Sequence, residues 1–191
     1  MTQARILAFA GSTRKDSYNY KLVQVAAEAA RSAGADVTLI DLKQYDLPLY
    51  NEDFERVNGL PENAKQLKQL FFEHHGFLIA SPEYNSSISP LLKNVIDWVS
   101  RRAEGETPLQ AYQDKTAALL AAAPGTGGRR GLTHLRSILT NIGTLVIPRQ
   151  FTLAHAAQAF GDDGQLLDEK QSQAVVNVCK NLVEVTSKLN S

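Results

Sequence analysis

Five strongly apolar runs recur along this chain of 191 residues, and each is followed by a segment with helical periodicity. Nearly continuous apolar runs are typical of parallel strands that are buried on both faces. Strands that alternate with helices form a parallel sheet that the helices cover on both sides. The pattern predicts an α/β protein with one domain over residues 1–191 and strands at 4–10, 36–42, 76–81, 116–123 and 144–148.

Helices are expected between and after these strands, at about 18–33, 61–75, 90–102, 132–142 and 169–189. Ser89 and Pro90 mark one helix start, because serine caps the first turn of a helix and proline fits its first position. Residues 43–60 match neither pattern. An irregular stretch of that length is often a functional loop or an interface element.

The order of the strands decides where a ligand can bind. Doubly wound sheets of five parallel strands commonly take the spatial order 2-1-3-4-5, counted along the chain. That order reverses between the first and third strands, and ligands bind there beyond the carboxyl ends of the strands. We therefore expect the functional loops to be those that follow the strands at 4–10, 76–81 and 116–123.

The charges of the chain are balanced, with 20 Lys and Arg against 20 Asp and Glu. This balance predicts no binding to nucleic acid or to an anionic membrane surface. No apolar run is long enough to span a bilayer and no secretory leader precedes the first strand, so a cytoplasmic location is expected. The single cysteine, Cys179, excludes an intramolecular disulfide and is expected to be buried in the last helix.

The loop at residues 11–19 has the chemistry of a phosphate site. It leads into a helix N-terminus, where unpaired N–H groups and a partial positive charge favour an anion. Ser12, Ser17 and Asn19 add side-chain donors, and Arg14 adds a planar cation. The glycines of a dinucleotide fingerprint or a P-loop are absent, so a terminal monophosphate fits better. The alternative is an ordinary loop in which Ser17 caps the helix.

Two further loops follow strands at the same edge of the expected sheet. Residues 81–86 contain Pro82 and Tyr84, and their backbone N–H groups can face a planar heterocycle, with the tyrosine covering an aromatic edge. Residues 124–128 contain three glycines, which allow a ligand to approach the backbone closely. Each loop alone is equally explained as a tight turn. Together the three loops describe a ligand with a phosphate at one end and a flat polar ring at the other, as in FMN.

These motifs resemble the NADPH-dependent FMN reductase family, whose members include quinone, azo-dye and chromate reductases. The resemblance covers nearly the whole chain and implies a flavodoxin-like fold, FMN and NADPH as cofactors, and a small-molecule electron acceptor. It also implies a homodimer or homotetramer, for which residues 43–60 and the helix at 90–102 are the expected interface. The matching residues are Gly11-Ser12, Arg14, Ser17 and Asn19, then Pro82-Glu83-Tyr84-Asn85, then Leu92-Lys93-Asn94 and Ile96-Asp97-Trp98.

The same resemblance implies which residues bind the cofactor. It assigns the phosphate to the first loop, the isoalloxazine ring to the second and the far side of the flavin to the third. Relatives often carry serines where this chain has Ala121, Ala122 and Ala123, so contacts there have to come from the backbone. Neither a catalytic side chain nor a metal is expected, because the flavin performs the redox chemistry. The cofactor-binding set is Ser12, Arg14, Ser17, Tyr18, Asn19, Pro82, Glu83, Tyr84, Asn85, Ala122 and Gly125.

Several charged residues have two interpretations. Glu83 is either a general base or a residue whose backbone matters while its side chain is solvated, and we favour the second. Arg129 and Arg130 either hold the 2′-phosphate of NADPH or form a solvated helix start. His74 and His75 are not expected to form a metal pair, because adjacent helical residues do not share a face.

Two other classes of protein remain open at this point. A flavodoxin-type electron carrier has the same fold, but its phosphate loop is usually rich in Thr and Gly and the protein is usually acidic. A flavin-free regulatory or phosphosugar-binding α/β domain is the other alternative. Oxidation of NADPH separates the enzyme from the carrier, and binding of added FMN separates both from the flavin-free domain.

Overall fold

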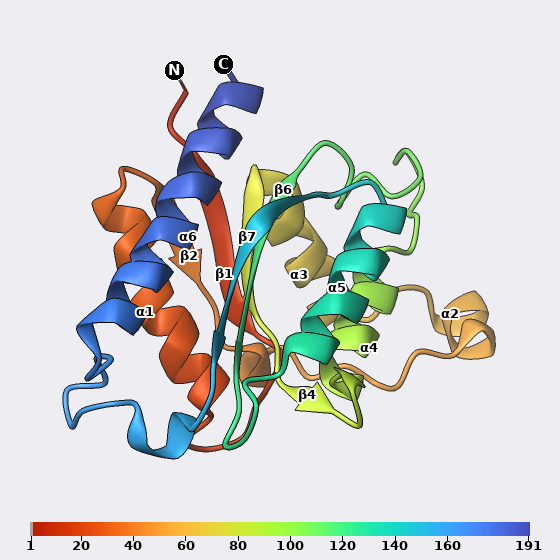
Figure 1. The fold of residues 1–191 in the computed structure, drawn as a ribbon. Coiled ribbons are helices and arrows are strands. Elements are labelled where there is room, and N and C mark those ends of the chain that lie inside the picture. Colours follow the sequence, from red (N-terminus) through yellow and green to blue (C-terminus); the bar gives the residue numbers. More distant parts are fainter. Residues whose placement is uncertain (1) are drawn as a thin grey trace.

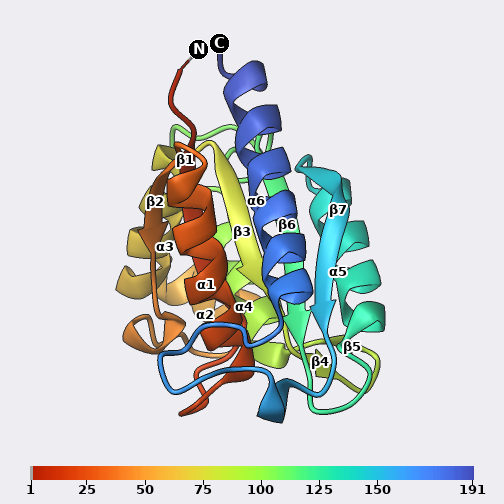
Figure 2. The ribbon, with the colours of Figure 1, turned by 60° about the vertical axis from the view of Figure 1, so that its left-hand side comes forward.

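A computed structural model describes residues 2–191 and contains a five-stranded parallel sheet in the order β2-β1-β3-β6-β7 (Figures 1 and 2). Every neighbouring pair in this sheet is parallel. Strands β6 and β7 are the fourth and fifth strands of this sheet along the chain, since β4 (Glu83–Tyr84) and β5 (Ser87–Ile88) form a separate hairpin. The observed order therefore confirms the predicted order 2-1-3-4-5. The strands are β1 at Arg5–Ala10, β2 at Asp36–Leu39, β3 at Gly76–Ala80, β6 at Thr116–Ala122 and β7 at Leu145–Leu153.

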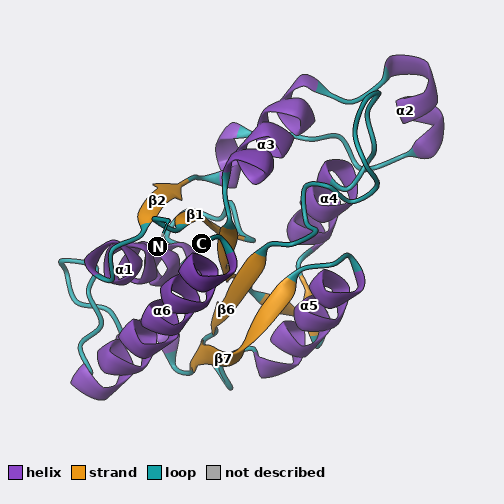
Figure 3. Cartoon of the chain, turned by 90° about the horizontal axis from the view of Figure 1, so that it is seen from above, coloured by secondary structure: helices purple, strands orange, loops and turns teal. Residues whose placement is uncertain are grey.

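Helices cover both faces of the sheet (Figure 3). Helices α1 (Tyr18–Ser32) and α6 (Glu169–Leu189) lie on one face. Helices α3 (Glu62–Glu73), α4 (Pro90–Val99) and α5 (Arg129–Asn141) lie on the other. Successive side chains of a strand point to opposite faces, so alternate residues of β1 enter two separate apolar clusters, and both clusters are buried.

Serine caps set the starts of two helices at the edge where the strands end. The Ser17 Oγ accepts a hydrogen bond from the Tyr20 N–H and starts α1. The Ser89 Oγ accepts one from the Leu92 N–H, and Pro90 occupies the first position of α4, as predicted. A side-chain cap satisfies a backbone donor that the first turn would otherwise leave unpaired.

Several predicted boundaries were wrong. Strand β2 ends before residue 42, because Leu42–Gln44 form a 3₁₀ turn capped by Asp41. Strand β7 continues past Pro148 to Leu153. It can do so because it is an edge strand and the pairing register shifts between Ala117 and Leu119, which accommodates a residue without an N–H. Helix α4 ends at Val99 instead of 102, and α5 begins at Arg129 instead of 132.

Residues 46–60 form an arm that projects from the body of the protein (Figures 1 and 3). The arm contains the short helix α2 (Glu52–Asn58), where the sequence predicted an irregular stretch. Helix α4 holds the arm through Asn94, whose Oδ1 accepts from the Tyr50 N–H at 2.8 Å and whose Nδ2 donates to the Pro48 carbonyl at 3.0 Å. The Trp98 Nε1 donates to the same carbonyl at 2.7 Å.

A small hairpin lies just beyond β3. It consists of β4 (Glu83–Tyr84) and β5 (Ser87–Ile88), which pair antiparallel. Asn85 and Ser86 at its tip have positive φ angles of 51° and 65°. A two-residue hairpin turn of type I′ requires positive φ at both of its central residues. The sequence predicted a turn here but not the two short strands.

No helix in residues 2–191 is both long and apolar enough to cross a membrane.

Candidate active site

A cavity of about 380 Å³ lies beyond the carboxyl ends of β1, β3 and β6. Figure 2 shows these ends at the lower side of the molecule, beside the hairpin. Ala123 and Pro124, which directly follow the end of β6, belong to the cavity wall. The sequence placed them at the third loop but did not include them in the cofactor-binding set. Ser17, Asn85 and Gly125, which were predicted, are not part of the wall. The wall consists of Ser12, Arg14, Tyr18, Asn19, Pro82, Glu83, Tyr84, Ala122, Ala123 and Pro124.

Arg14 fastens the loop that leads into α1. Its Nη1 donates to the Lys15 carbonyl and its Nη2 to the Asp16 carbonyl, both at 3.0 Å. Its guanidinium carbon lies 5.2 Å from the centre of the Tyr18 ring. Arg14 is nevertheless exposed, so the cation remains at the mouth of the cavity. Helix α1 begins beside this loop, and the first turn of a helix has backbone N–H groups that favour an anion. This end of the cavity is therefore suited to an anion.

Asn19 serves a different purpose from its neighbours. Its side chain is buried, its Nδ2 donates to the Ala122 carbonyl, and its Oδ1 accepts from the Ala122 N–H, each at 2.9 Å. This pair of hydrogen bonds joins the start of α1 to the end of β6. The Ala122 N–H is therefore engaged inside the protein and is not free to bind a ligand.

Gly11 allows three elements to meet at the edge of the cavity. A Cβ atom at this position would lie 3.0 Å from the Leu92 Cβ and 3.4 Å from the Pro82 Cδ. The Ser89 Oγ also donates to the Gly11 carbonyl at 2.7 Å. Any larger residue would push α4 or the loop after β3 away from the first loop.

Glu83 departs from the interpretation that we favoured. Its side chain is half-buried rather than solvated, and its Oε2 accepts a hydrogen bond of 2.8 Å from the Gly131 N–H in α5. The expectation of a solvated side chain was wrong because α5 begins three residues earlier than predicted and brings this N–H next to the hairpin. Tyr84 beside it is about half exposed and forms part of the cavity wall.

The cavity fits FMN in the arrangement of its polar groups. One end has a cation, hydroxyl groups and a helix N-terminus, which together suit a phosphate. The other end is bordered by a hairpin and by the loop after β6, where Gly127 and Gly128 have φ angles of 88° and 82°. The close packing at Gly11 keeps the two ends together.

The remaining candidate residues lie elsewhere or serve the fold. Arg129 and Arg130 are both exposed, and the Arg130 Nη1 lies 3.3 Å from the Ser86 Oγ of the hairpin. His74 has its Nδ1 2.6 Å from the Leu70 carbonyl and its Nε2 2.8 Å from the Thr38 Oγ1, so both ring nitrogens are engaged. Cys179 is buried as predicted, and burial raises the pKa of its thiol to about 12.

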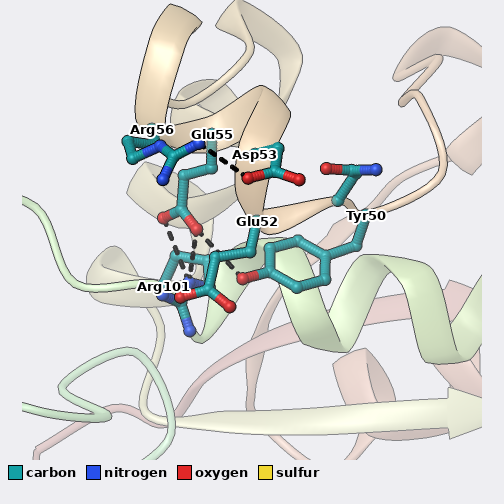
Figure 4. Close-up of a pocket in the computed structure, with 7 residues that line it drawn as sticks. Tyr50, Glu52, Asp53, Glu55, Arg56 and Arg101 are labelled. Carbon is teal, nitrogen blue, oxygen red and sulfur yellow. Dashed lines mark hydrogen bonds and ion pairs between the residues drawn. The ribbon is translucent and has the colours of Figure 1, made fainter.

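A larger hollow, of about 730 Å³, lies in the arm and not at the sheet edge (Figure 4). Both of its arginines are paired with carboxylates: the Arg101 Nε donates to both Glu55 oxygens, at 3.0 and 2.8 Å, and Arg56 pairs with Asp53 at 2.8 Å. Burial and then the hydrogen bond to Glu55 raise the pKa of Tyr50. Because both arginines of this hollow are already paired with carboxylates, no cation among its described residues is left to bind an anionic ligand, and we assign the ligand chemistry to the smaller cavity.

Comparison with known proteins decides the family. The sequence model of the NADPH-dependent FMN reductases matches residues 4–158. The chain belongs to this family. It is therefore an oxidoreductase that uses FMN and NADPH, built on a flavodoxin-like fold.

Individual relatives of the reductase agree with this assignment. It is 35% identical to an NADPH:quinone oxidoreductase of Arabidopsis thaliana, over 97% of this chain and 93% of the relative. It is 34% identical to an NAD(P)H-dependent FMN reductase of Pseudomonas aeruginosa, over 90% of this chain and 89% of the relative. Among solved structures, the flavoenzyme FerB of Paracoccus denitrificans, an NAD(P)H:(acceptor) oxidoreductase, superposes with a TM-score of 0.81. The two are 30% identical, and the match covers 97% of this chain and 98% of FerB.

Proposed function

We propose that this reductase transfers electrons from NADPH to quinones or similar small electrophiles, such as azo dyes or chromate, through FMN bound in the cavity at the sheet edge. The observation that carries the proposal is the cavity itself, with a phosphate-type loop at one end and a hairpin at the other. The named activities of the relatives support the choice of quinones as acceptors. The whole chain, residues 1–191, acts as one FMN-binding domain in this proposal.

In this proposal the two ends of the cavity hold different parts of FMN. Ser12, Arg14 and the start of α1, with Ser17, Tyr18 and Asn19, hold the phosphate. Pro82 to Asn85 hold the ring, and Ala122 to Gly125 border its other side. Asn19 is the weakest phosphate ligand of this set, because its carbonyl oxygen and one amide proton already bind Ala122.

The reaction divides between cofactor and protein. FMN supplies the redox chemistry, since a flavin ring accepts a hydride from NADPH and passes two electrons to an acceptor. The protein binds the phosphate with Arg14 and orients the ring with the backbone of the hairpin. In this proposal no side chain moves a proton at the flavin. This agrees with the position of the Glu83 carboxylate, which accepts a hydrogen bond from the Gly131 N–H.

Steady-state kinetics with NADPH and a substituted benzoquinone test this function. Donor and acceptor are expected to use the same opening in turn, which gives parallel lines when reciprocal rate is plotted against reciprocal quinone concentration at several NADPH concentrations. Lines that meet at a point would contradict the shared opening. Absence of NADPH oxidation by protein loaded with FMN would instead favour the electron carrier.

We also propose that the reductase forms a homodimer or homotetramer through the arm and α4. The arm supports this because it contains two strongly exposed apolar side chains, Leu49 and Val57, which expose 80% and 77% of their surface. Light scattering on the wild type and on Leu49→Ser/Val57→Ser tests it, with a smaller particle expected for the variant. The proposal includes a cytoplasmic location, where NADPH is supplied.

A further inference from the structure

Helix α5 begins without a cap of its own. Its N-cap is Gly128, which has no side chain, and its first turn contains Arg129 and Arg130 but no acidic residue. A helix start normally gains from a side chain that accepts from the N–H of its second or third residue and from negative charge near its first turn. Two arginines at this position have the opposite effect. The start of α5 therefore needs an acceptor from elsewhere in the protein.

Glu83 supplies that acceptor from the hairpin. Its Oε2 lies 2.8 Å from the nitrogen of Gly131, which is the third residue of α5. This is the N–H that a capping side chain usually serves. The carboxylate also places a negative charge beside a first turn that contains two arginines. Glu83 thus does for α5 what Ser17 and Ser89 do for their own helices, but from a different element.

The packing around this contact is too close for most residues. A Cβ atom at Gly131 would lie 3.1 Å from the Ser87 carbonyl oxygen and 3.3 Å from the Glu83 Cβ. A Cβ atom at Gly128 would lie 3.4 Å from the Glu83 Cβ. The hairpin therefore rests directly on the start of α5. A further side-chain contact joins the same two elements, with the His134 Nδ1 3.1 Å from the Ser87 Oγ.

We propose that Glu83 is a positioning residue that locks the hairpin to the glycine loop and α5, and so fixes the ring end of the flavin cavity. Glu83 itself lines that cavity, and Pro124, at the start of the loop that Glu83 holds, also lines it. The proposal rests on the FMN site of the proposed function. This role of Glu83 differs from a role in phosphate binding. If the ring end of the cavity is no longer fixed, the binding of every flavin weakens, with or without a phosphate.

Titration of FMN and of riboflavin into apoprotein tests this role by fluorescence quenching, without any turnover. Glu83→Ala is expected to raise the dissociation constants of both flavins by a similar factor, about tenfold, since a hydrogen bond to a charged group is lost. Glu83→Gln keeps an acceptor for the Gly131 N–H and is expected to restore most of the affinity. Asp168→Ala is the matched control, because Asp168 caps α6 through the Gln171 N–H at 3.0 Å but is not part of the cavity wall.

Hydrogen exchange in the apoprotein measures the same contact without flavin. Faster exchange in the first turn of α5 is expected in Glu83→Ala, and no change there in Asp168→Ala. The proposal would be overturned if Glu83→Ala left both the exchange in the first turn of α5 and the affinity for the two flavins unchanged. It would also be overturned if Glu83→Ala weakened the binding of FMN but not that of riboflavin. If the wild type binds neither flavin, the proposed function is wrong, and the exchange result still decides whether Glu83 locks the hairpin to α5.

Discussion

Neighbouring polar residues in the first loop have opposite roles. Asn19 is buried and both groups of its amide bind the backbone of Ala122, whereas Arg14 is exposed and donates to carbonyl groups of its own loop. The sequence offers both as phosphate donors, because it shows the residue types but not which of them the fold uses internally. Arg14 is therefore the better candidate for an ionic contact with a phosphate.

Replacement of Arg14 tests the phosphate end of the cavity. Arg14→Ala is expected to weaken FMN binding by about 1.5–3 kcal/mol, the usual worth of a hydrogen bond to a charged group, and to leave riboflavin binding nearly unchanged. Isothermal titration with both flavins measures the difference. Arg14→Lys is the control that keeps the charge but not the planar fork. An equal loss for both flavins would mean that Arg14 acts by folding its loop around the Lys15 and Asp16 carbonyls.

At the scale of elements, the structure contains two pieces that the sequence did not predict. Helix α2 has seven residues, none of them buried, and a helix that short depends on tertiary contacts rather than on its own periodicity. The hairpin β4–β5 has strands of two residues each and an Asn-Ser tip instead of the usual Asn-Gly signal. Both pieces are specified by contacts with α4 and α5, which a local pattern does not reveal.

The attachment of the arm to α4 is open to a direct test. Asn94→Ala removes both side-chain hydrogen bonds to the arm backbone, so the free energy of local opening is expected to fall by about 1–3 kcal/mol. Hydrogen exchange over residues 48–58 measures this fall. Asn177→Ala, at an exposed position on α6, is the control and should leave the arm unchanged. Exchange in the arm that is equally slow in the wild type and in Asn94→Ala would contradict this account.

At the scale of the whole molecule, the alternation of apolar runs and helices predicted a parallel sheet covered by helices on both faces. The strand order was predicted from the order that doubly wound sheets of five strands commonly take. The carboxyl edge then brought together three loops that are far apart in sequence. The sequence could not show that the Glu83 side chain points to α5, since that depends on where the glycine loop ends. It could equally not show that the Ala122 N–H is already bound.

The most direct test of the account is an absorbance titration of apoprotein with FMN, followed by NADPH without oxygen. We predict saturation at an equimolar amount of FMN, then loss of the visible flavin band when NADPH is added and its return when a quinone follows. Protein that leaves the FMN spectrum unchanged, or a bound flavin band that NADPH does not bleach, would contradict the central claim.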